Sequence, residues 1–361
     1  ILAPKLVTAT FIFAFGACVG SFLNVVAHRL PSGRSVVSPP SRCPGCGWRL
    51  TWHENLPVIG WLILRGRCRR CGGPISIQYP AIELLVAGLF TVTYLLLYAS
   101  PEGSALSDIG GRWWRAGGFG STWPAFAILM AMTSGLVVTT IVDARTFLIP
   151  AGITNTMVLV AFVGWGIQGI IPAHPALEIL EADGRGPLPM IGWGMVGIVT
   201  GGSIGTLLSA GLLRSGRIPR SFDDYDDYVT GESPLAEYPH GRREMAKEIL
   251  FLMPIMFGGL AGWLIVDVTG PITTTPPRFI EFLASSGLGF LVGGGVVWLI
   301  RILGTLAFGR EAMGMGDVHL LAAIGAALGW IDPIRIFFIA PFLALGWLAG
   351  GRILSLFKGG H

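Results

Sequence analysis

The sequence predicts an all-α, polytopic membrane protein with about nine transmembrane helices and one small polar module that contains four cysteines. Three observations predict this class. Hydrophobic residues make up 52% of the 361 residues and charged residues only 13%, whereas soluble domains carry about 25% charged residues. Apolar runs that approach or exceed the length needed to cross a bilayer recur along the chain. Four of the five cysteines fall in two Cys-x-x-Cys pairs within one polar stretch.

The apolar runs define the expected spans. The first has no charge between Lys5 and His28, and it lacks the basic start and the small-residue cleavage site of a signal peptide. Between the later runs, 100–122, 173–189 and 214–247 are expected to be polar connections, and the last of these to be a solvated insert. The nine expected spans, of which the eighth is short, are 4–27, 80–99, 123–142, 149–171, 190–213, 249–268, 283–308, 318–331 and 334–357.

The polar stretch 28–79 has the spacing of a metal site. Two Cys-x-x-Cys pairs stand 21 residues apart, and four thiolates can complete the tetrahedral shell of a structural Zn²⁺. Glycines at 45, 47, 72 and 73 permit the tight turns that such pairs need. A redox dithiol and an iron–sulfur centre are the alternatives, and the paired spacing favours zinc over both. The expected ligands are Cys43, Cys46, Cys68 and Cys71.

Two aspartates stand at the ends of apolar runs. Asp143 follows the third run, and Asp317 lies in Gly314-Met315-Gly316-Asp317 between the seventh and eighth. An ionisable group at such a place is costly and is a hypothesis for a functional site. Two carboxylates that share a proton can act as general acid and general base on water, which predicts an aspartyl protease. The structural alternative is that each merely caps a helix, Asp317 at a helix that begins at Val318.

The distribution of basic residues predicts the orientation. With nine spans, the four-cysteine segment, both aspartates and the 214–247 insert fall on one side of the membrane. That side holds most of the 25 lysine and arginine residues, so it is expected to be cytoplasmic. The net charge of +4 is small, and no nucleic acid partner is expected.

With these residues in view, the chain resembles the type IV prepilin peptidases, which are bifunctional leader peptidases and N-methyltransferases of the membrane aspartyl peptidase class. The resemblance is almost continuous from about residue 16 to residue 90 and returns at both aspartates. It rests on Gly20-Ser-Phe-Leu-Asn-Val-Val-Ala-His-Arg-Leu-Pro31, on the cysteine segment with Glu54-Asn-Leu-Pro-Val58 and Gln78-Tyr-Pro-Ala-Ile-Glu83, on Asp143 with Ile149-Pro150, and on Gly314-Met-Gly-Asp-Val318.

The resemblance implies a function and a location. Asp143 and Asp317 would be the catalytic pair, supported by Gly314, Gly316 and Pro150. The substrate would be a prepilin or pseudopilin of a type IV pilus or type II secretion system, cut at the cytoplasmic face of the bacterial inner membrane. The new N-terminus would then be methylated with S-adenosylmethionine, and the zinc segment belongs to the part of the family associated with that transfer.

The resemblance also implies a division of the chain and shows some departures. Residues 1–27 would form the first helix, 28–79 the zinc-binding, methyltransferase-associated segment, and 80–361 the membrane peptidase domain with an insert at about 214–248. His319 stands where family members often have lysine, and Ala151 where many have an acid.

The methyltransferase site is the least defined part of this prediction. The sequence contains no glycine-rich cofactor fingerprint. Asn24 and Glu83 are candidates only because topology places them near the cysteine module. The structural alternatives are interhelical hydrogen bonding for Asn24 and a helix-dipole contact for Glu83.

Three other functions compete with this one. A peptidase of the same type could lack methyl transfer or act on another substrate. A proton- or cation-coupled transporter would use the aspartates as ion sites but predicts internal repeats, and none is evident in the sequence. A structural assembly subunit would tolerate substitution of both aspartates.

Overall fold

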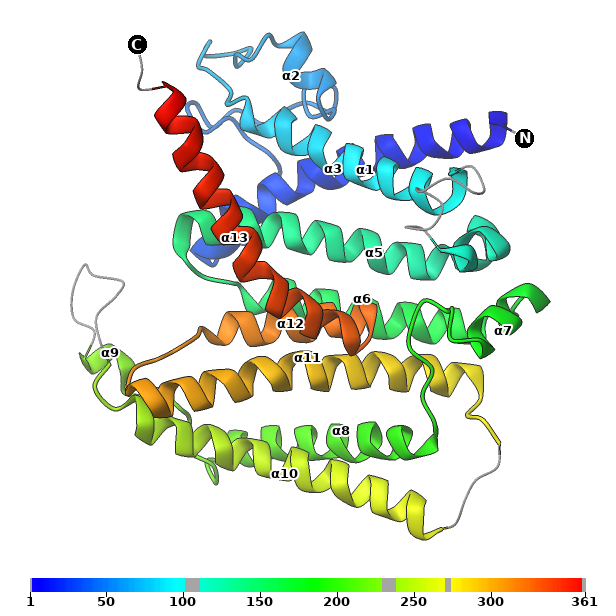
Figure 1. Cartoon of the computed structure of the whole chain (residues 1–361). Coiled ribbons are helices and arrows are strands. Elements are labelled where there is room, and N and C mark those ends of the chain that lie inside the picture. The colour runs from blue at the N-terminus through cyan, green and yellow to red at the C-terminus, as the bar shows by residue number, and fades with distance from the viewer. Residues whose placement is uncertain (1, 101–110, 229–237, 270–273, 359–361) are drawn as a thin grey trace. The chain divides into compact units, whose positions relative to one another are not determined.

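A computed structural model describes residues 2–100, 111–228, 238–269 and 274–358 (Figure 1). Within these ranges the regular structure is helical, and the only β pairing is two isolated bridges, Arg42 with Arg49 and Arg67 with Pro74. The predicted all-α class is confirmed. The main helices are α1 (Leu2–Arg29), α3 (Gln78–Tyr94), α5 (Arg112–Thr146), α6 (Ala151–Ile170), α8 (Trp193–Arg214), α10 (Gly241–Val268), α11 (Arg278–Phe308), α12 (Met315–Leu328) and α13 (Ile331–Lys358).

Eight of the described helices are long and apolar enough to cross a membrane. The ninth apolar helix, α12, has 14 residues, fewer than the roughly 20 that a straight span needs. It corresponds to the eighth expected run, which the sequence already marked as short. The chain is thus a multi-pass membrane protein by the length and composition of its helices.

The chain divides into two compact units, and the first comprises Ile1–Val160 with Ile171–Gly186. In this unit α1 packs along α3, and two glycines one helical turn apart make the close approach possible (Figure 1). A Cβ added at Gly16 would lie 2.8 Å from the Cα of Ala87, and one added at Gly20 would lie 2.7 Å from the Cα of Glu83. Small residues at such a contact let helix backbones touch in lipid. The same contact sets Asn24 and Glu83 near one end of the helix pair.

Two connections of this unit differ from the expected irregular loops. Helix α5 begins at Arg112, so the second half of 100–122 is helical apart from a kink at Gly118. Residues 101–110 lie outside the described ranges. The 173–189 segment contains helix α7 (Pro175–Ala182), which starts with a proline after the N-cap His174. The Nε1 of Trp113 donates a hydrogen bond to the Glu181 carboxylate at 2.8 Å. One acid of this expected polar connection is therefore buried and hydrogen-bonded.

The second unit comprises Ala161–Ile170 and Pro187–His361, and two helix pairs within it meet at glycines. Helices α8 and α10 lie side by side, where a Cβ on Gly201 would come 1.9 Å from the carbonyl oxygen of Gly258 (Figure 1). Helices α11 and α12 meet in the same way, at Gly289 and Gly325. The abundance of glycine in the sequence is explained in part by these backbone contacts.

Candidate functional site

The four cysteines of the first unit form a compact cluster. Their sulfur atoms all lie within 4.8 Å of one another, and the Sγ atoms are 3.9 Å apart in both the Cys43–Cys71 and the Cys46–Cys68 pair. A tetrahedral zinc ion with Zn–S bonds of about 2.3 Å requires sulfurs about 3.8 Å apart. The cluster therefore fits one zinc ion with four thiolate ligands, which leaves no open position for catalysis.

The two Cys-x-x-Cys turns have the same local structure. In each, the first cysteine accepts a hydrogen bond at 2.9 Å from the amide of a glycine four residues later, Gly47 or Gly72. Those two glycines have φ of 68° and 69°, in the left-handed region that favours glycine. Of the four glycines predicted to make the turns, these are the two whose backbone conformation requires it.

The backbone near the cluster also stabilises the thiolate form of Cys68. Amides of Cys71 and Arg70 donate hydrogen bonds to the sulfur of Cys68, and they lower its pKa to about 6. The Trp48 amide favours the Cys46 thiolate, but burial and the other cysteine sulfurs outweigh it and raise the pKa of Cys46 to about 11. Because every metal ligand must be deprotonated, the cluster favours metal loading at Cys68 and opposes it at Cys46.

A cavity of about 670 Å³ lies beside the cysteine cluster, between the module and the ends of α1 and α3. Polar side chains that line it include Ser21, Asn24, Glu54 and Glu83, together with Cys43 and Cys71. This volume is within the range of about 300–1,000 Å³ that is common for small-molecule sites. The structure thus brings together Asn24, Glu83 and the cysteines, which the sequence linked only through topology.

The two buried glutamates of this cavity are held by backbone amides. Glu83 accepts a hydrogen bond from the amide of Val58 at 2.6 Å, and Glu54 accepts one from the amide of Thr51 at 2.9 Å. The Thr51 amide, assisted by the Thr51 hydroxyl, lowers the pKa of Glu54. Asn24 donates to the carbonyl of Tyr79 at 3.2 Å. Glu54 entered the sequence analysis only within a family motif, and its burial beside a cavity was not readable from that motif.

Asp143 lies in the first unit, in the last turn of α5, and is exposed. Its carbonyl accepts the amide of Phe147 at 2.9 Å, and Phe147 ends the helix in a left-handed conformation with φ of 54°. Pro150 follows and its carbonyl accepts the amide of Ile153, so it leads directly into α6. The backbone around Asp143 is fixed while its carboxylate faces outward.

Asp317 lies in the second unit, in the first turn of α12. The helix begins at Met315 with Gly314 as N-cap, so Asp317 is the third helical residue and not the cap of a helix that begins at Val318. The capping alternative is wrong in that form. A Cβ added at Gly314 would lie 3.6 Å from the Asp317 Oδ2. The carboxylate thus turns back toward the glycine motif at a helix end where negative charge is favoured.

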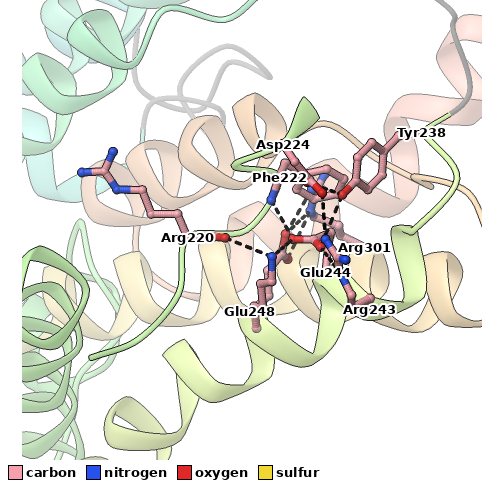
Figure 2. A network of polar contacts seen from close by, with 9 residues as sticks. Arg220, Phe222, Asp224, Tyr238, Arg243, Glu244, Glu248 and Arg301 are labelled. Atoms are coloured by element: carbon pink, nitrogen blue, oxygen red, sulfur yellow. Dashed lines mark hydrogen bonds and ion pairs between the residues drawn. The ribbon is translucent and has the colours of Figure 1, made fainter. Parts of the chain in front are cut away.

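A third group of charges was not singled out from the sequence. Glu248 and Arg301 are each only 2% exposed, and the Arg301 Nη2 lies 3.1 Å from the Glu248 Oε1 (Figure 2). Both residues fall inside or at the edge of apolar runs, where a charge is unusual, and that was the available signal. Their separation by 53 residues concealed the pairing.

The 214–247 insert is not the simple solvated loop that was expected. It contains a short helix, α9 (Tyr225–Tyr228), and the Asp224 carboxylate accepts a hydrogen bond from the Tyr238 hydroxyl at 2.5 Å. Buried Glu244 pairs with Arg243 at 3.0 Å (Figure 2). It also pairs with Lys247 at 2.8 Å. Residues 229–237 of the insert lie outside the described ranges.

Two family models match the sequence. Residues 14–97 match the bacterial peptidase A24 N-terminal domain, and residues 250–349 match the type IV leader peptidase family. The first match contains the cysteine cluster, Asn24 and Glu83. The second contains Asp317, whereas Asp143 lies between the two matches.

Curated relatives agree with both models. A prepilin leader peptidase/N-methyltransferase of Myxococcus xanthus is 58% identical over 82 residues, which is 23% of this chain and 24% of the relative. Proteins of the same name from Klebsiella pneumoniae and Xanthomonas campestris are 35% and 34% identical, over 40% and 45% of this chain and 56% of each relative. The alignments therefore span between about a quarter and just over half of these relatives.

No solved structure matches. The two family models together match about half of the 361 residues, at both ends of the chain, and the cysteine cluster and the Gly-Met-Gly-Asp motif each lie inside one of them. The C-terminal region of the chain is therefore similar to the type IV leader peptidase family, and its N-terminal region to the bacterial peptidase A24 N-terminal domain.

Proposed function

We propose that this protein removes the leader of prepilin-like proteins with an aspartate pair and then methylates the new N-terminus. The observation that carries the peptidase half is Gly314-Met315-Gly316-Asp317 at the start of α12, inside the matched peptidase region. The relatives' shared name, prepilin leader peptidase/N-methyltransferase, supports both halves.

The mechanism needs one ionised and one protonated carboxylate. Asp317 lies in the first turn of a helix, where the dipole stabilises negative charge, so we assign it the role of the base that takes a proton from water. Asp143 is then the acid that polarises the scissile carbonyl. Gly314 and Gly316 lack side chains and leave room for a peptide backbone to approach the carboxylate.

Methyl transfer is assigned to the cavity beside the cysteine cluster. S-adenosylmethionine supplies an electrophilic methyl group on a positively charged sulfonium. Glu54 and Glu83 provide two buried carboxylates in a cavity of sufficient volume, which suits a ligand with positive charges. The zinc ion, with four sulfur ligands, would hold the two Cys-x-x-Cys turns that form one wall.

The peptidase assignment is tested by measuring cleavage of a prepilin-like peptide by this protein embedded in lipid nanodiscs. Asp143→Asn and Asp317→Asn should each abolish cleavage in folded protein. Asp267→Asn and Asp332→Asn are matched controls, because Asp267 is also exposed in the last turn of a helix and Asp332 also lies in a first turn. Cleavage by Asp317→Asn at the wild-type rate would end the assignment, and ion transport lost with the aspartates would favour the transporter.

The methyltransferase assignment is tested by mass and by affinity. In Glu83→Gln, the amide oxygen can still accept from Val58, but the charge that faces the ligand is lost. The peptide should be cleaved normally without the mass increase of a methyl group, and calorimetry should show weaker binding of S-adenosylmethionine. Exposed Glu178→Gln is the control. Normal methylation by Glu83→Gln would remove the cavity from the mechanism.

The location follows from the same proposal. Several helices can span a bilayer, and the relatives process prepilins, so we infer a multi-pass protein of the bacterial inner membrane with the active site on the cytoplasmic face. Cysteine labelling from either side of spheroplasts at single engineered cysteines in the 214–248 insert tests this orientation.

A further inference from the structure

Arg301 is a buried arginine in the apolar helix α11, and it meets three different segments of the second unit. Its Nε lies 3.3 Å from both carboxylate oxygens of Glu248 on α10. Its guanidinium carbon lies 5.4 Å from the ring centroid of Phe222, in the insert (Figure 2). An arginine fork can hold several acceptors at once in fixed geometry, which a lysine cannot.

The third segment is the connection between α11 and α12. The Nη1 of Arg301 donates hydrogen bonds to the Glu311 carboxylate and to the carbonyl of Met313. The amide of Ala312 donates to the hydroxyl of Thr305, one turn beyond Arg301 on α11, at 3.1 Å. Each of the three consecutive residues 311–313 is therefore bonded to α11.

These bonds end where the glycine–aspartate motif begins. Met313 directly precedes Gly314, the N-cap of α12, and the carbonyl of Gly314 accepts the amide of Asp317 at 3.3 Å. The position of the Met313 carbonyl thus sets where the first turn of α12 starts. A Cβ added at Gly304 of α11 would lie 2.7 Å from the Cβ of Ala312, so the connection packs directly against this helix.

We propose that Arg301 is a positioning residue for the reaction, which holds residues 311–313 against α11 and thereby fixes the place of Asp317. This inference rests on the proposed peptidase function. The alternative is that Arg301 only neutralises Glu248, because a buried carboxylate without a partner is strongly destabilising. The bonds to Glu311 and Met313 are not needed for that role, and they favour positioning.

Two variants separate these roles. Arg301→Met alone leaves Glu248 buried without its cation and could simply unfold the protein. Arg301→Met combined with Glu248→Met removes both charges, and replacing a buried pair with apolar residues is often neutral for stability. We expect the double variant to keep the fold and to lack the contacts to residues 311–313. It also removes the Glu248 acceptor of the Trp298 Nε1, which lies 2.7 Å away, so its unfolding midpoint is measured first. Arg278→Met is the matched control, since Arg278 also lies on α11, donates to the carbonyl of Gln168 at 2.7 Å and stacks on Phe282, at the opposite end of the helix.

Two readouts are made on nanodisc-embedded protein. Hydrogen–deuterium exchange reports the order of residues 309–317 without reference to activity, and steady-state cleavage of a prepilin-like peptide gives kcat and KM separately. The double variant should exchange faster at 309–317 and lose about 100-fold in kcat with little change in KM, the size of effect that an ångström-scale misplacement produces. Arg301→Lys should fall between wild type and the double variant.

The outcomes distinguish the two hypotheses. A double variant with wild-type exchange at 309–317 and wild-type kcat would overturn the positioning role and leave charge neutralisation. Equal loss in the Arg278→Met control would also overturn it, because the effect would then belong to α11 as a whole. If wild-type protein cleaves no prepilin, the proposed function fails, while the exchange measurement still decides whether Arg301 orders the connection.

Discussion

The two polar segments of the chain, 28–79 in the first unit and the 214–248 insert in the second, are organised by different chemistry. The first surrounds four cysteine sulfurs that lie within 4.8 Å of one another. The second is organised around its own Glu244, which is fully buried and paired with Arg243 and Lys247, and its Phe222 contacts Arg301 of α11. One segment is centred on four potential metal ligands, and the other on paired charges that lie mostly within the segment itself.

This difference affects how each segment responds to perturbation. Metal binding in a small domain is coupled to its folding, so one event orders the whole segment. Paired charges contribute in smaller, separable amounts, and the cost of losing one partner depends on how deeply the other is buried. The comparison predicts a graded series of effects.

The largest effect should follow removal of zinc. Chelation, or Cys46→Ser, should raise hydrogen exchange across 43–73 and abolish methyl transfer, because structural zinc contributes about 10–16 kcal/mol in comparable small domains. Leader cleavage should survive, since neither Asp143 on α5 nor Asp317 on α12 lies in the cysteine segment. Cys18→Ser, outside the cluster, is the control. Full methyl transfer by protein free of zinc would refute a structural role for the metal.

The next effect should come from breaking the buried ion pair in the second unit. Glu248→Gln leaves the buried Arg301 with Glu311 as its remaining carboxylate partner and should cost about 3 kcal/mol. A thermal unfolding midpoint lower by several degrees measures this. Zinc content, measured by elemental analysis, should stay at the wild-type value. Loss of zinc in this variant would show that the two segments are not independent.

A pair of glycine variants, with an expected effect of intermediate size, tests packing within the cysteine segment. A Cβ on Gly60 would lie 2.3 Å from the carbonyl oxygen of Glu54, whereas one on Gly45 meets only sulfur atoms at 3.9 Å. Gly60→Ala must shift the turn that carries Glu54, at a cost of about 1–3 kcal/mol. Calorimetry should show roughly tenfold weaker binding of S-adenosylmethionine, the equivalent of about 1.4 kcal/mol. Gly45→Ala should bind normally, and equal affinities would contradict the role of Glu54.

The smallest effect should come from Asp224 in the insert. The Tyr238 hydroxyl, together with Arg243, lowers the pKa of this carboxyl, so the ionised form stabilises the folded state. That contribution is present above the ordinary aspartate value of about 3.9 and is lost as pH falls through the lowered pKa. Asp224→Asn should therefore lower the unfolding midpoint slightly at pH 7. The difference from wild type should vanish in strong acid, and a difference that grows there would reverse the assigned sign.

The same contrast explains what the sequence could predict. The four-cysteine cluster was predictable because its members come in two local pairs, each closed by glycine turns that are visible in the sequence. The apolar runs were equally visible, since composition over about 20 residues is a strong signal for a span. Asp143 and Asp317 were noticed because each interrupts or ends such a run, and their catalytic pairing stays a prediction.

Other features depend on contacts that no local pattern encodes. Glu248 and Arg301 are 53 residues apart, and only Glu248 lies at the boundary of an expected span, while Arg301 lies inside one. Helix α7 was missed because an eight-residue helix between prolines and glycines gives little periodicity. The hydrogen bond from Trp113 to buried Glu181 joins residues 68 positions apart, which no local pattern encodes. The cavity beside the cysteines required α1 and α3 to meet at Gly16 and Gly20, which fixes where Glu83 lies.

The glycine contacts of the second unit have a mechanical consequence. Where Gly201 meets Gly258, and Gly289 meets Gly325, main chain touches main chain, and no side chain is present to change rotamer and absorb a displacement. We therefore expect the helix pairs α8–α10 and α11–α12 each to move as a rigid body. The motion that admits a peptide substrate should then occur between these helix pairs and not within them. Cross-linking the two helices of either pair across its glycine contact should leave leader cleavage intact.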